Sequence, residues 1–299
     1  MMRWLNGSFH KLPNQATAKP ERPGGGGRQR CKRWASAGSI LLLVTASLSG
    51  VAIPAHAAPT TIVSLTLDDG NANQFAAAQV LKSHGLAGTF FITTSWIGTA
   101  GYLTQTNLQT LASDGNEIGG HTVTHPDLTT LSPSAAAAEV CNGKTTLENW
   151  GFPVRNFAYP FASENAAVQT AVKDCGYASA RGLGDITSPA SCAGCPFAET
   201  LPPGNPMVTK APDEVDSTWT LKNLQDLVTN AESTGGWLQL TFHHIAVGTD
   251  PTLTISPALF ESFITWLAAR TANGSTSVRT VAQALGQSAA TAPAPAPAR

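Results

Sequence analysis

The chain is poor in charge, in aromatic side chains and in cysteine. Of its 299 residues only 12% are charged and 7% are aromatic, and it has five cysteines. Its longest apolar run, residues 40–54, is interrupted by serine and glycine and is shorter than the roughly 20 residues that a membrane-spanning helix needs. The sequence also lacks internal repeats and a second Cys-x-x-Cys pair. These absences argue against a repeat protein, a membrane-spanning protein and a four-cysteine structural zinc site.

Residues 1–57 have the pattern of a secretory leader. A basic stretch at residues 28–33 precedes the apolar run, and Ala55-His56-Ala57 supplies the small-x-small pattern after which signal peptidase cleaves. We therefore predict a signal peptide over 1–57 and a secreted, extracellular protein with no membrane attachment after cleavage. A permanent N-terminal anchor is the alternative interpretation, and Met2 is an alternative start.

Removing the leader changes the charge balance of the chain. The full sequence carries 18 basic and 19 acidic residues, and the leader holds eight of the basic ones but only Glu21 of the acidic ones. The remaining ten basic and 18 acidic residues give a net charge of −8. Such a protein should repel nucleic acid and other polyanions. We therefore expect no nucleic-acid partner, and we favour a neutral polymer as the substrate.

The cysteines that follow the leader are even in number, which favours disulfides in an exported chain. They are Cys141, Cys175, Cys192 and Cys195, while Cys31 lies in the leader. Of the three ways to pair four cysteines, we favour Cys141–Cys175 together with Cys192–Cys195.

Strand and helix patterns alternate along the rest of the chain. We predict strands over 61–67, 88–93, 117–120, 156–159, 177–180, 237–242 and 277–279. We predict helices over 71–84, 104–114, 133–150, 164–175, 220–234, 257–271 and 281–285. This alternation favours a parallel sheet with helices outside it. We expect one α/β domain over 58–288, a distorted (β/α) barrel of about seven units, with a long loop over 182–216 and a disordered Ala/Pro tail over 289–299.

Polar segments follow several of the predicted strands, at the edge where barrel active sites gather. Asp68-Asp69 follows the first strand, and His121 and His125 follow the third. Two imidazoles and a carboxylate are the ligand set of a catalytic zinc site, in which zinc can lower the pKa of a coordinated water. Taken singly, Asp-Asp-Gly could form a turn and either histidine could be structural. The two motifs together predict a metal-dependent hydrolase.

His243 follows the strand predicted over 237–242. A histidine has an ordinary pKa near 6.5, which suits proton transfer at neutral pH. We therefore interpret His243 as a general acid, with a strand-capping role as the alternative. Its neighbour His244 is expected to point elsewhere.

These segments together resemble a known family. Thr66-Leu-Asp-Asp-Gly70, His121-Thr-x-x-His125, Phe157-Ala-Tyr-Pro-Phe161 and Leu240-Thr-Phe-His243 are similar to the motifs of NodB-homology polysaccharide deacetylases, carbohydrate esterase family four. The resemblance spans about residues 61–285. It implies a distorted βα barrel and a divalent metal, usually zinc and alternatively cobalt. It also implies removal of acetyl groups from a sugar polymer.

The resemblance assigns a role to each matching position. It implies that Asp69, His121 and His125 bind the metal, that Asp68 is the general base and that His243 is the general acid. It further implies that the backbone N–H of Phe161 stabilises the oxyanion, and that Leu240 and Tyr159 line the substrate pocket. We expect a monomer that acts on an acetylated polysaccharide or oligosaccharide.

The chain departs from the family pattern in several places. Ala158 stands where members have an arginine that tunes the base, and either Arg155 or Arg181 could replace it. A fourth motif, typically aspartate with tryptophan, is not evident near 177–185. The substrate could be an N-acetylglucosamine polymer, such as chitin or peptidoglycan, or acetylxylan. The alternatives are an inactive sugar-binding relative and a metal-dependent amidohydrolase that acts on small C–N substrates.

Overall fold

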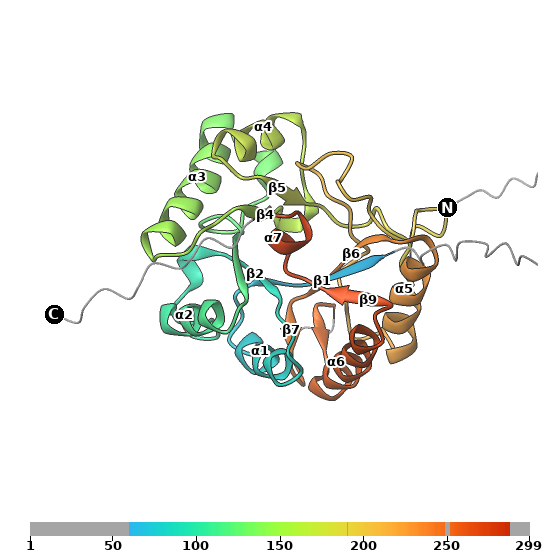
Figure 1. Cartoon of the computed structure of the whole chain (residues 1–299). Coiled ribbons are helices and arrows are strands. Elements are labelled where there is room, and N and C mark those ends of the chain that lie inside the picture. Colours follow the sequence, from blue (N-terminus) through green and yellow to red (C-terminus); the bar gives the residue numbers. More distant parts are fainter. Residues whose placement is uncertain (1–59, 190, 249–251, 288–299) are drawn as a thin grey trace, which may run out of the picture. The chain divides into compact units, whose positions relative to one another are not determined.

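The computed structural model describes residues 60–189, 191–248 and 252–287. The predicted leader over 1–57 and the predicted tail over 289–299 therefore lie outside the described residues. The described residues form one α/β domain, as the alternation predicts (Figure 1). None of its helices is long and apolar enough to cross a membrane.

A curled, seven-stranded parallel sheet forms the centre of the domain (Figure 1). Its strands lie in the order β5-β4-β3-β2-β1-β6, and β9 pairs with β1 beside them. Their bounds are β1 Thr61–Asp69, β2 Thr89–Ile92, β3 Glu117–Gly120, β4 Asn156–Ala158, β5 Ser179–Arg181, β6 Gly236–Phe242 and β9 Thr276–Val278. Two short strands, β7 His244–Ile245 and β8 Thr254–Ile255, pair separately and were not predicted. The curled sheet confirms the predicted distorted barrel.

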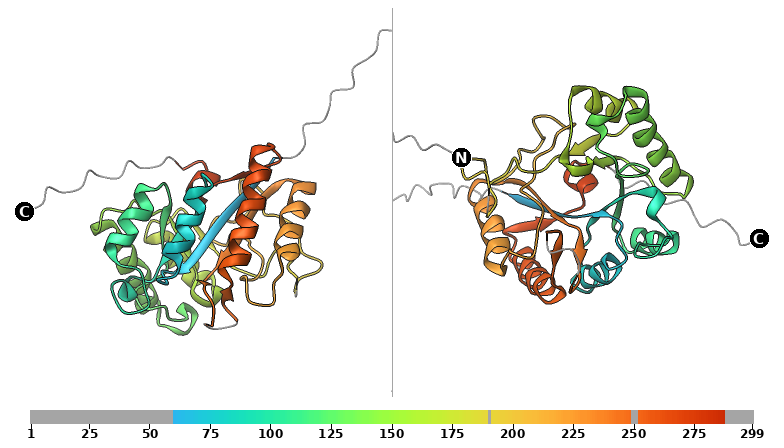
Figure 2. Two further views of the ribbon diagram at one scale, coloured as in Figure 1. Left: turned by 90° about the horizontal axis from the view of Figure 1, so that it is seen from below. Right: turned by 180° about the vertical axis from the view of Figure 1, so that it is seen from behind.

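Helices α1 to α6 cover the outer face of this sheet, as the two views in Figure 2 show, whereas the short α7 lies over the middle of the curl, where Val281 packs against Phe91 and Trp237. The helices are α1 Gln74–Ser83, α2 Gln105–Ser113, α3 Pro133–Asn149, α4 Ala166–Asp174, α5 Leu221–Thr234, α6 Pro257–Ala272 and α7 Val281–Ala284. Local sequence explains where they begin. Thr104 and Thr220 form capping boxes with the asparagine three residues later, and Ser132 and Ser256 cap helices that start with proline.

The two faces of β1 differ in polarity. Val63, Leu65 and Leu67 are fully buried in the apolar core that the helices cover. The alternate residues face the inside of the curl, where Ser64 accepts a hydrogen bond from the Trp237 indole at 2.9 Å. Thr66 contacts Thr241 of β6 there at 3.1 Å. The interior of the curl therefore holds polar side chains beside a small apolar cluster of Phe91, Ala158, Trp237 and Val281, and polar side chains at the carboxyl end of the sheet can form a site.

The predicted long loop over 182–216 spans the gap between the edge strands β5 and β6. Thr209 forms a bridge with Arg181 of β5, and Glu199 forms one with Trp237 of β6. The Val215 N–H donates to the Thr241 carbonyl at 2.9 Å. The loop thus takes the place of a further strand between the two edges.

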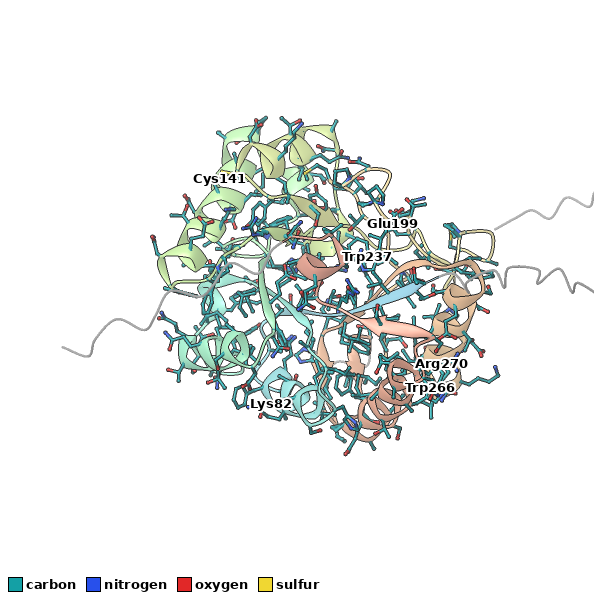
Figure 3. The ribbon with its side chains drawn as sticks, in the orientation of Figure 1. Lys82, Cys141, Glu199, Trp237, Trp266 and Arg270 are labelled. Atoms are coloured by element: carbon teal, nitrogen blue, oxygen red, sulfur yellow. A yellow bond between two sulfur atoms is a disulfide. The ribbon has the colours of Figure 1, made fainter. Side chains whose placement is uncertain are left out.

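Both predicted disulfides are present. Cys141–Cys175 joins α3 to the C-terminal end of α4, and Cys192–Cys195 closes a short turn in the long loop. Figure 3 shows Cys141 among the helices of the outer layer and Trp237 near the sheet. The first bridge therefore ties together two helices that cover neighbouring strands.

Candidate functional site

The predicted site residues gather at the carboxyl end of the sheet, where barrel active sites form. Asp68 and Asp69 end β1, and His121 and His125 follow β3. Phe161 follows β4, and His243 follows β6. With Tyr159 they line one pocket of about 430 Å³, so the structure brings seven of the eight predicted residues together.

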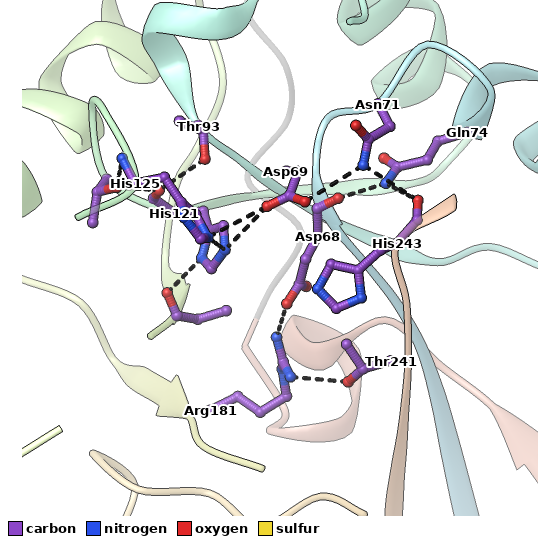
Figure 4. A network of polar contacts seen from close by, with 12 residues as sticks. Asp68, Asp69, Asn71, Gln74, Thr93, His121, His125, Arg181, Thr241 and His243 are labelled. Atoms are coloured by element: carbon purple, nitrogen blue, oxygen red, sulfur yellow. Dashed lines mark hydrogen bonds and ion pairs between the residues drawn. The ribbon is translucent and has the colours of Figure 1, made fainter. Parts of the chain in front are cut away.

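Three of these residues point their ligand atoms at one another. One ligand atom each from Asp69, His121 and His125 lies within 4.8 Å of the other two. The Nε2 atoms of the histidines are 3.1 Å apart, and each lies 3.5 Å from Asp69 Oδ1. Figure 4 shows both rings turned toward the carboxylate. This arrangement agrees with the predicted metal triad.

The polar atoms of this triad have the environment that a cation requires. His121 Nδ1 lies 2.7 Å from the Ala158 carbonyl, and donation to that acceptor leaves Nε2 with a lone pair for a ligand. Asp69 Oδ1 is buried without a hydrogen-bond partner among the described residues. Convergent nitrogen and oxygen lone pairs in one pocket fit a divalent cation such as zinc.

The surroundings also set the charge of the triad in its metal-free form. Burial raises the pKa of Asp69, but the polar contact with His121 at 3.5 Å and the charges of three nearby histidines outweigh it and hold the pKa well below its usual range. Burial and the neighbouring His121 lower the pKa of His125 to about 4. At neutral pH Asp69 is therefore a carboxylate and His125 a neutral imidazole, which are the forms that bind metals. Burial lowers the pKa of His121, but the neighbouring Asp69 and Asp68 outweigh it and raise that pKa, so a cation competes there with a proton.

Helix α3 holds the loop that carries the two histidines. Thr122 and His125 have φ of 71° and 62°, a conformation that is uncommon outside glycine. The Glu139 carboxylate accepts the N–H groups of Val123 and Thr124 at 3.0 and 2.9 Å, which fixes this bent backbone. Gly143 packs so closely that an added Cβ would lie 3.0 Å from the Thr122 backbone.

A buried ion pair holds the predicted base. Arg181 Nη2 donates to Asp68 Oδ2, and Arg181 Nη1 donates to Thr241 Oγ1 at 2.9 Å. Both Asp68 and Arg181 are nearly inaccessible, at 3% and 2% exposure, and the guanidinium lies 5.5 Å from the centre of the Phe91 ring. Of the two arginines that the sequence left open, the structure therefore selects Arg181.

His243 lies on the opposite side of Asp69 from His121 and His125, next to Asp68 (Figure 4). Its Nδ1 is buried and has no hydrogen-bond partner within the described ranges. Its neighbour His244 is absent from the residues that line the pocket and lies 3.1 Å from Asn73 through its ring nitrogen. The histidine that faces the pocket is thus the one that the motif predicted.

Leu240 is a correction, because it does not line the pocket. It pairs with Leu65 of β1 and is fully buried in the apolar core under the helices. Alternation along β6 turns Leu240 outward and Thr241 inward. Leu183 and Leu253, which the motifs did not indicate, line the pocket with Tyr159 and Phe161.

Other residues near the triad were also missed. Trp96 packs its ring against His125 at 5.2 Å and against Tyr102 at 4.9 Å. Asp213 and Glu214 from the long loop line the pocket. No motif marks any of these four residues. For Asp213 and Glu214, one indication came from the sequence, the predicted long loop without regular structure.

Comparison with known proteins agrees with this geometry. Residues 55–180 match the sequence model of a family described as polysaccharide deacetylase. The chain is 29% identical over 117 residues to the putative polysaccharide deacetylase YxkH of Bacillus subtilis, covering 38% of this chain and 42% of that protein. It is 28% identical over 119 residues to a chitin deacetylase of Colletotrichum lindemuthianum, covering 39% and 48%. The chain therefore spans less than half the length of these curated relatives.

A solved structure shares the fold over most of both chains. It is a peptidoglycan N-acetylglucosamine deacetylase, which superposes with a TM-score of 0.51 at 14% identity over 78% of this chain and 92% of that one. At this identity the similarity establishes the common fold.

Proposed function

Because residues 55–180 carry a polysaccharide deacetylase domain of the NodB-homology type, as the motifs predicted, we propose that the protein is a metal-dependent polysaccharide deacetylase. It hydrolyses acetyl groups from a polymer or oligomer of N-acetylglucosamine, with acetylxylan as the second substrate class. One observation carries the proposal. A single pocket holds three convergent ligand atoms beside a carboxylate and a histidine that can exchange protons with a substrate.

Asp69, His121 and His125 would hold the divalent cation, with zinc or cobalt as the candidates. When bound, the cation would supply Lewis acidity toward the acetyl carbonyl and make a nearby water more acidic. The orphaned oxygen of Asp69 and the facing histidine nitrogens support this assignment.

The remaining residues supply proton transfer and orientation. Asp68 accepts the proton of the attacking water, while Arg181 holds its other oxygen in place. His243 donates a proton to the departing amine, because a protonated amine is a better leaving group. The Phe161 backbone N–H stabilises the negative oxygen that develops on the acetyl carbon. Phe161 lines the pocket in a left-handed backbone conformation with φ of 58°.

The residues that line the pocket favour a sugar without negative charge as the substrate. Among the described residues no lysine or arginine lines it, whereas Asp213 and Glu214 do. Phe161 is 66% exposed and packs edge-on against the His125 ring at 4.7 Å. Exposed aromatic surface of this kind can pack against the apolar face of a sugar ring.

We also propose that the protein acts outside the cell, as a monomer. The leader pattern over 1–57 and the two disulfides support export.

Acetate release tests this function. The purified protein, stripped of metal and then supplied with zinc, is incubated with chitooligosaccharides, peptidoglycan and acetylxylan. We expect acetate from the glucosamine polymers and little of it before zinc is added. Binding of oligosaccharide without acetate release would indicate an inactive relative. Release from small amides alone would indicate an amidohydrolase. Either result would contradict the proposal.

A further inference from the structure

We infer that three amide side chains position His243 against Asp68 in the proposed reaction. Asn71, Asn73 and Gln74 follow the Asp-Asp-Gly turn and lead into α1, and together we call them the amide clamp. They are positioning residues, since they act through the backbone of the two proton-transfer residues. The inference rests on the proposed function, which makes Asp68 the base and His243 the acid.

Gln74 connects the two strand ends directly. Its side chain is fully buried, and its Nε2 donates to the Asp68 carbonyl at 2.5 Å and to the His243 carbonyl at 2.8 Å. An amide nitrogen carries two hydrogens, so one group can satisfy both carbonyls. Figure 4 shows Gln74 between the ends of the two strands. Gln74 therefore fixes the backbone of the base relative to that of the acid.

Asn73 holds the segment just beyond His243. Its Oδ1 accepts the Ile245 N–H at 3.2 Å, and its Nδ2 lies 3.1 Å from His244 Nδ1. Asn71 adds a weaker contact, because its Nδ2 lies 3.4 Å from the His243 carbonyl and from Asp69 Oδ2. The clamp thus contacts the chain at His243 and again at the next two residues.

The position of His243 needs such support. Its ring nitrogen Nδ1 has no hydrogen-bond partner among the described residues, so that atom does not orient the ring. The residue lies between the end of β6 at Phe242 and the two-residue strand β7. The backbone must therefore place the ring, and the amide clamp is what ties this backbone to β1 and α1.

The test replaces Gln74 with methionine, which has a similar length and no hydrogen-bond donor. We expect kcat on chitooligosaccharides to fall by about 10- to 100-fold, the loss typical of a small misplacement of catalytic groups. KM and the zinc affinity of the metal-free protein should stay within about twofold of the parent values. A twofold margin is about the deviation seen when substitutions at separate sites do not interact. Gln79→Met is the matched control, since Gln79 is exposed on the same helix.

A second variant keeps the test decisive if Gln74→Met folds poorly. Asn73→Ala should make the Ile245 amide exchange hydrogen about fivefold faster, because it loses a bond of ordinary strength. It should also lower kcat. If the parent protein releases no acetate, the proposed function fails. The Ile245 exchange rate then tests only whether the amide clamp holds the backbone beyond His243. Unchanged exchange in Asn73→Ala, or kcat of folded Gln74→Met within threefold of the parent, would overturn the inference.

Discussion

The two halves of the pocket are held in different ways. The metal half, Asp69, His121 and His125, depends on a bent backbone that α3 supports through Glu139. The acid–base half, Asp68 and His243, depends on buried side chains that reach it from other elements. The first half comes from two short segments within residues 69–125, whereas the second joins Asp68 to His243 at the far end of the domain. Damage to one half should therefore leave the other measurably intact.

Loss of a metal ligand should have the largest effect. His121→Ala removes one of three ligand atoms, so we expect no zinc retained after dialysis and activity at background. The acid–base half should keep its structure, because within the described part of the chain Arg181 and Gln74 form hydrogen bonds with Asp68, Thr241 and His243 and none with His121. Zinc content by elemental analysis and acetate release measure the two effects. Full activity in a zinc-free His121→Ala protein would refute the triad.

Replacement of the proton-transfer residues should impair the acid–base half and leave the metal half intact. Asp68→Asn and His243→Ala should each lower kcat by about 10²- to 10⁴-fold, with zinc content unchanged. Their combined loss should be less than multiplicative if they act as a unit. A single variant that retains zinc and whose kcat is within about threefold of the parent value would contradict the role assigned to that residue, because the expected loss is far larger.

Removal of the guanidinium should destabilise the acid–base half. Arg181→Met leaves the buried Asp68 carboxylate without its partner, and loss of one member of a buried pair costs about 3–5 kcal/mol. The same replacement should cost much less in an Asp68→Asn background, because no charge is then stranded. Denaturant unfolding of the four proteins gives this cycle. Equal costs in both backgrounds would show that the pair does not couple.

Weakening the support of the histidine loop should act on the metal half. Glu139→Gln keeps the shape of the side chain but replaces the charged acceptor of both N–H groups by a neutral amide oxygen, which makes weaker hydrogen bonds. We expect zinc affinity to fall by about 10- to 100-fold, as is usual when an outer partner of the ligands is lost. Glu148→Gln is the control, because Glu148 lies on the same helix and its ion-pair partner among the described residues is Lys144, away from the histidine loop. Calorimetric zinc titration of both variants compares them.

The smallest effect on chemistry should come from the bridge between α3 and α4. Replacing Cys141 and Cys175 by serine opens a link across 34 residues, which chain-entropy arguments value at about 3–4 kcal/mol of stability. Since α3 carries Glu139, zinc affinity should fall slightly while kcat of the zinc-loaded enzyme stays near that of the parent. Thermal unfolding and zinc titration test both points. A drop in kcat without a drop in stability would contradict this account.

Much of this architecture could be predicted from the sequence because its signals are local. Each long strand and helix has its own periodicity, and the metal half lies in two short motifs. The sequence could not predict β7 and β8, since two-residue strands have no period. It also placed the end of β5 at residue 180, one residue short of Arg181. That arginine lies on the strand and points into the polar interior.

The remaining site residues depend on packing between distant segments. Arg181 is 113 residues from Asp68, and Gln74 is 169 residues from His243. No motif spacing connects such pairs. The resemblance places Leu240 in the pocket, but alternation along β6 turns that side chain toward the helices. Local patterns thus identify the reacting groups, and three-dimensional packing identifies what holds them.

The central claim is that one divalent cation, held by Asp69, His121 and His125, makes this pocket a deacetylase. Titration of the metal-free protein with zinc, followed by acetate release from a chitooligosaccharide, tests it most directly. We predict that activity rises from near zero and levels off at one zinc per chain. Full activity before zinc is added, or no acetate at any zinc concentration, would contradict the claim.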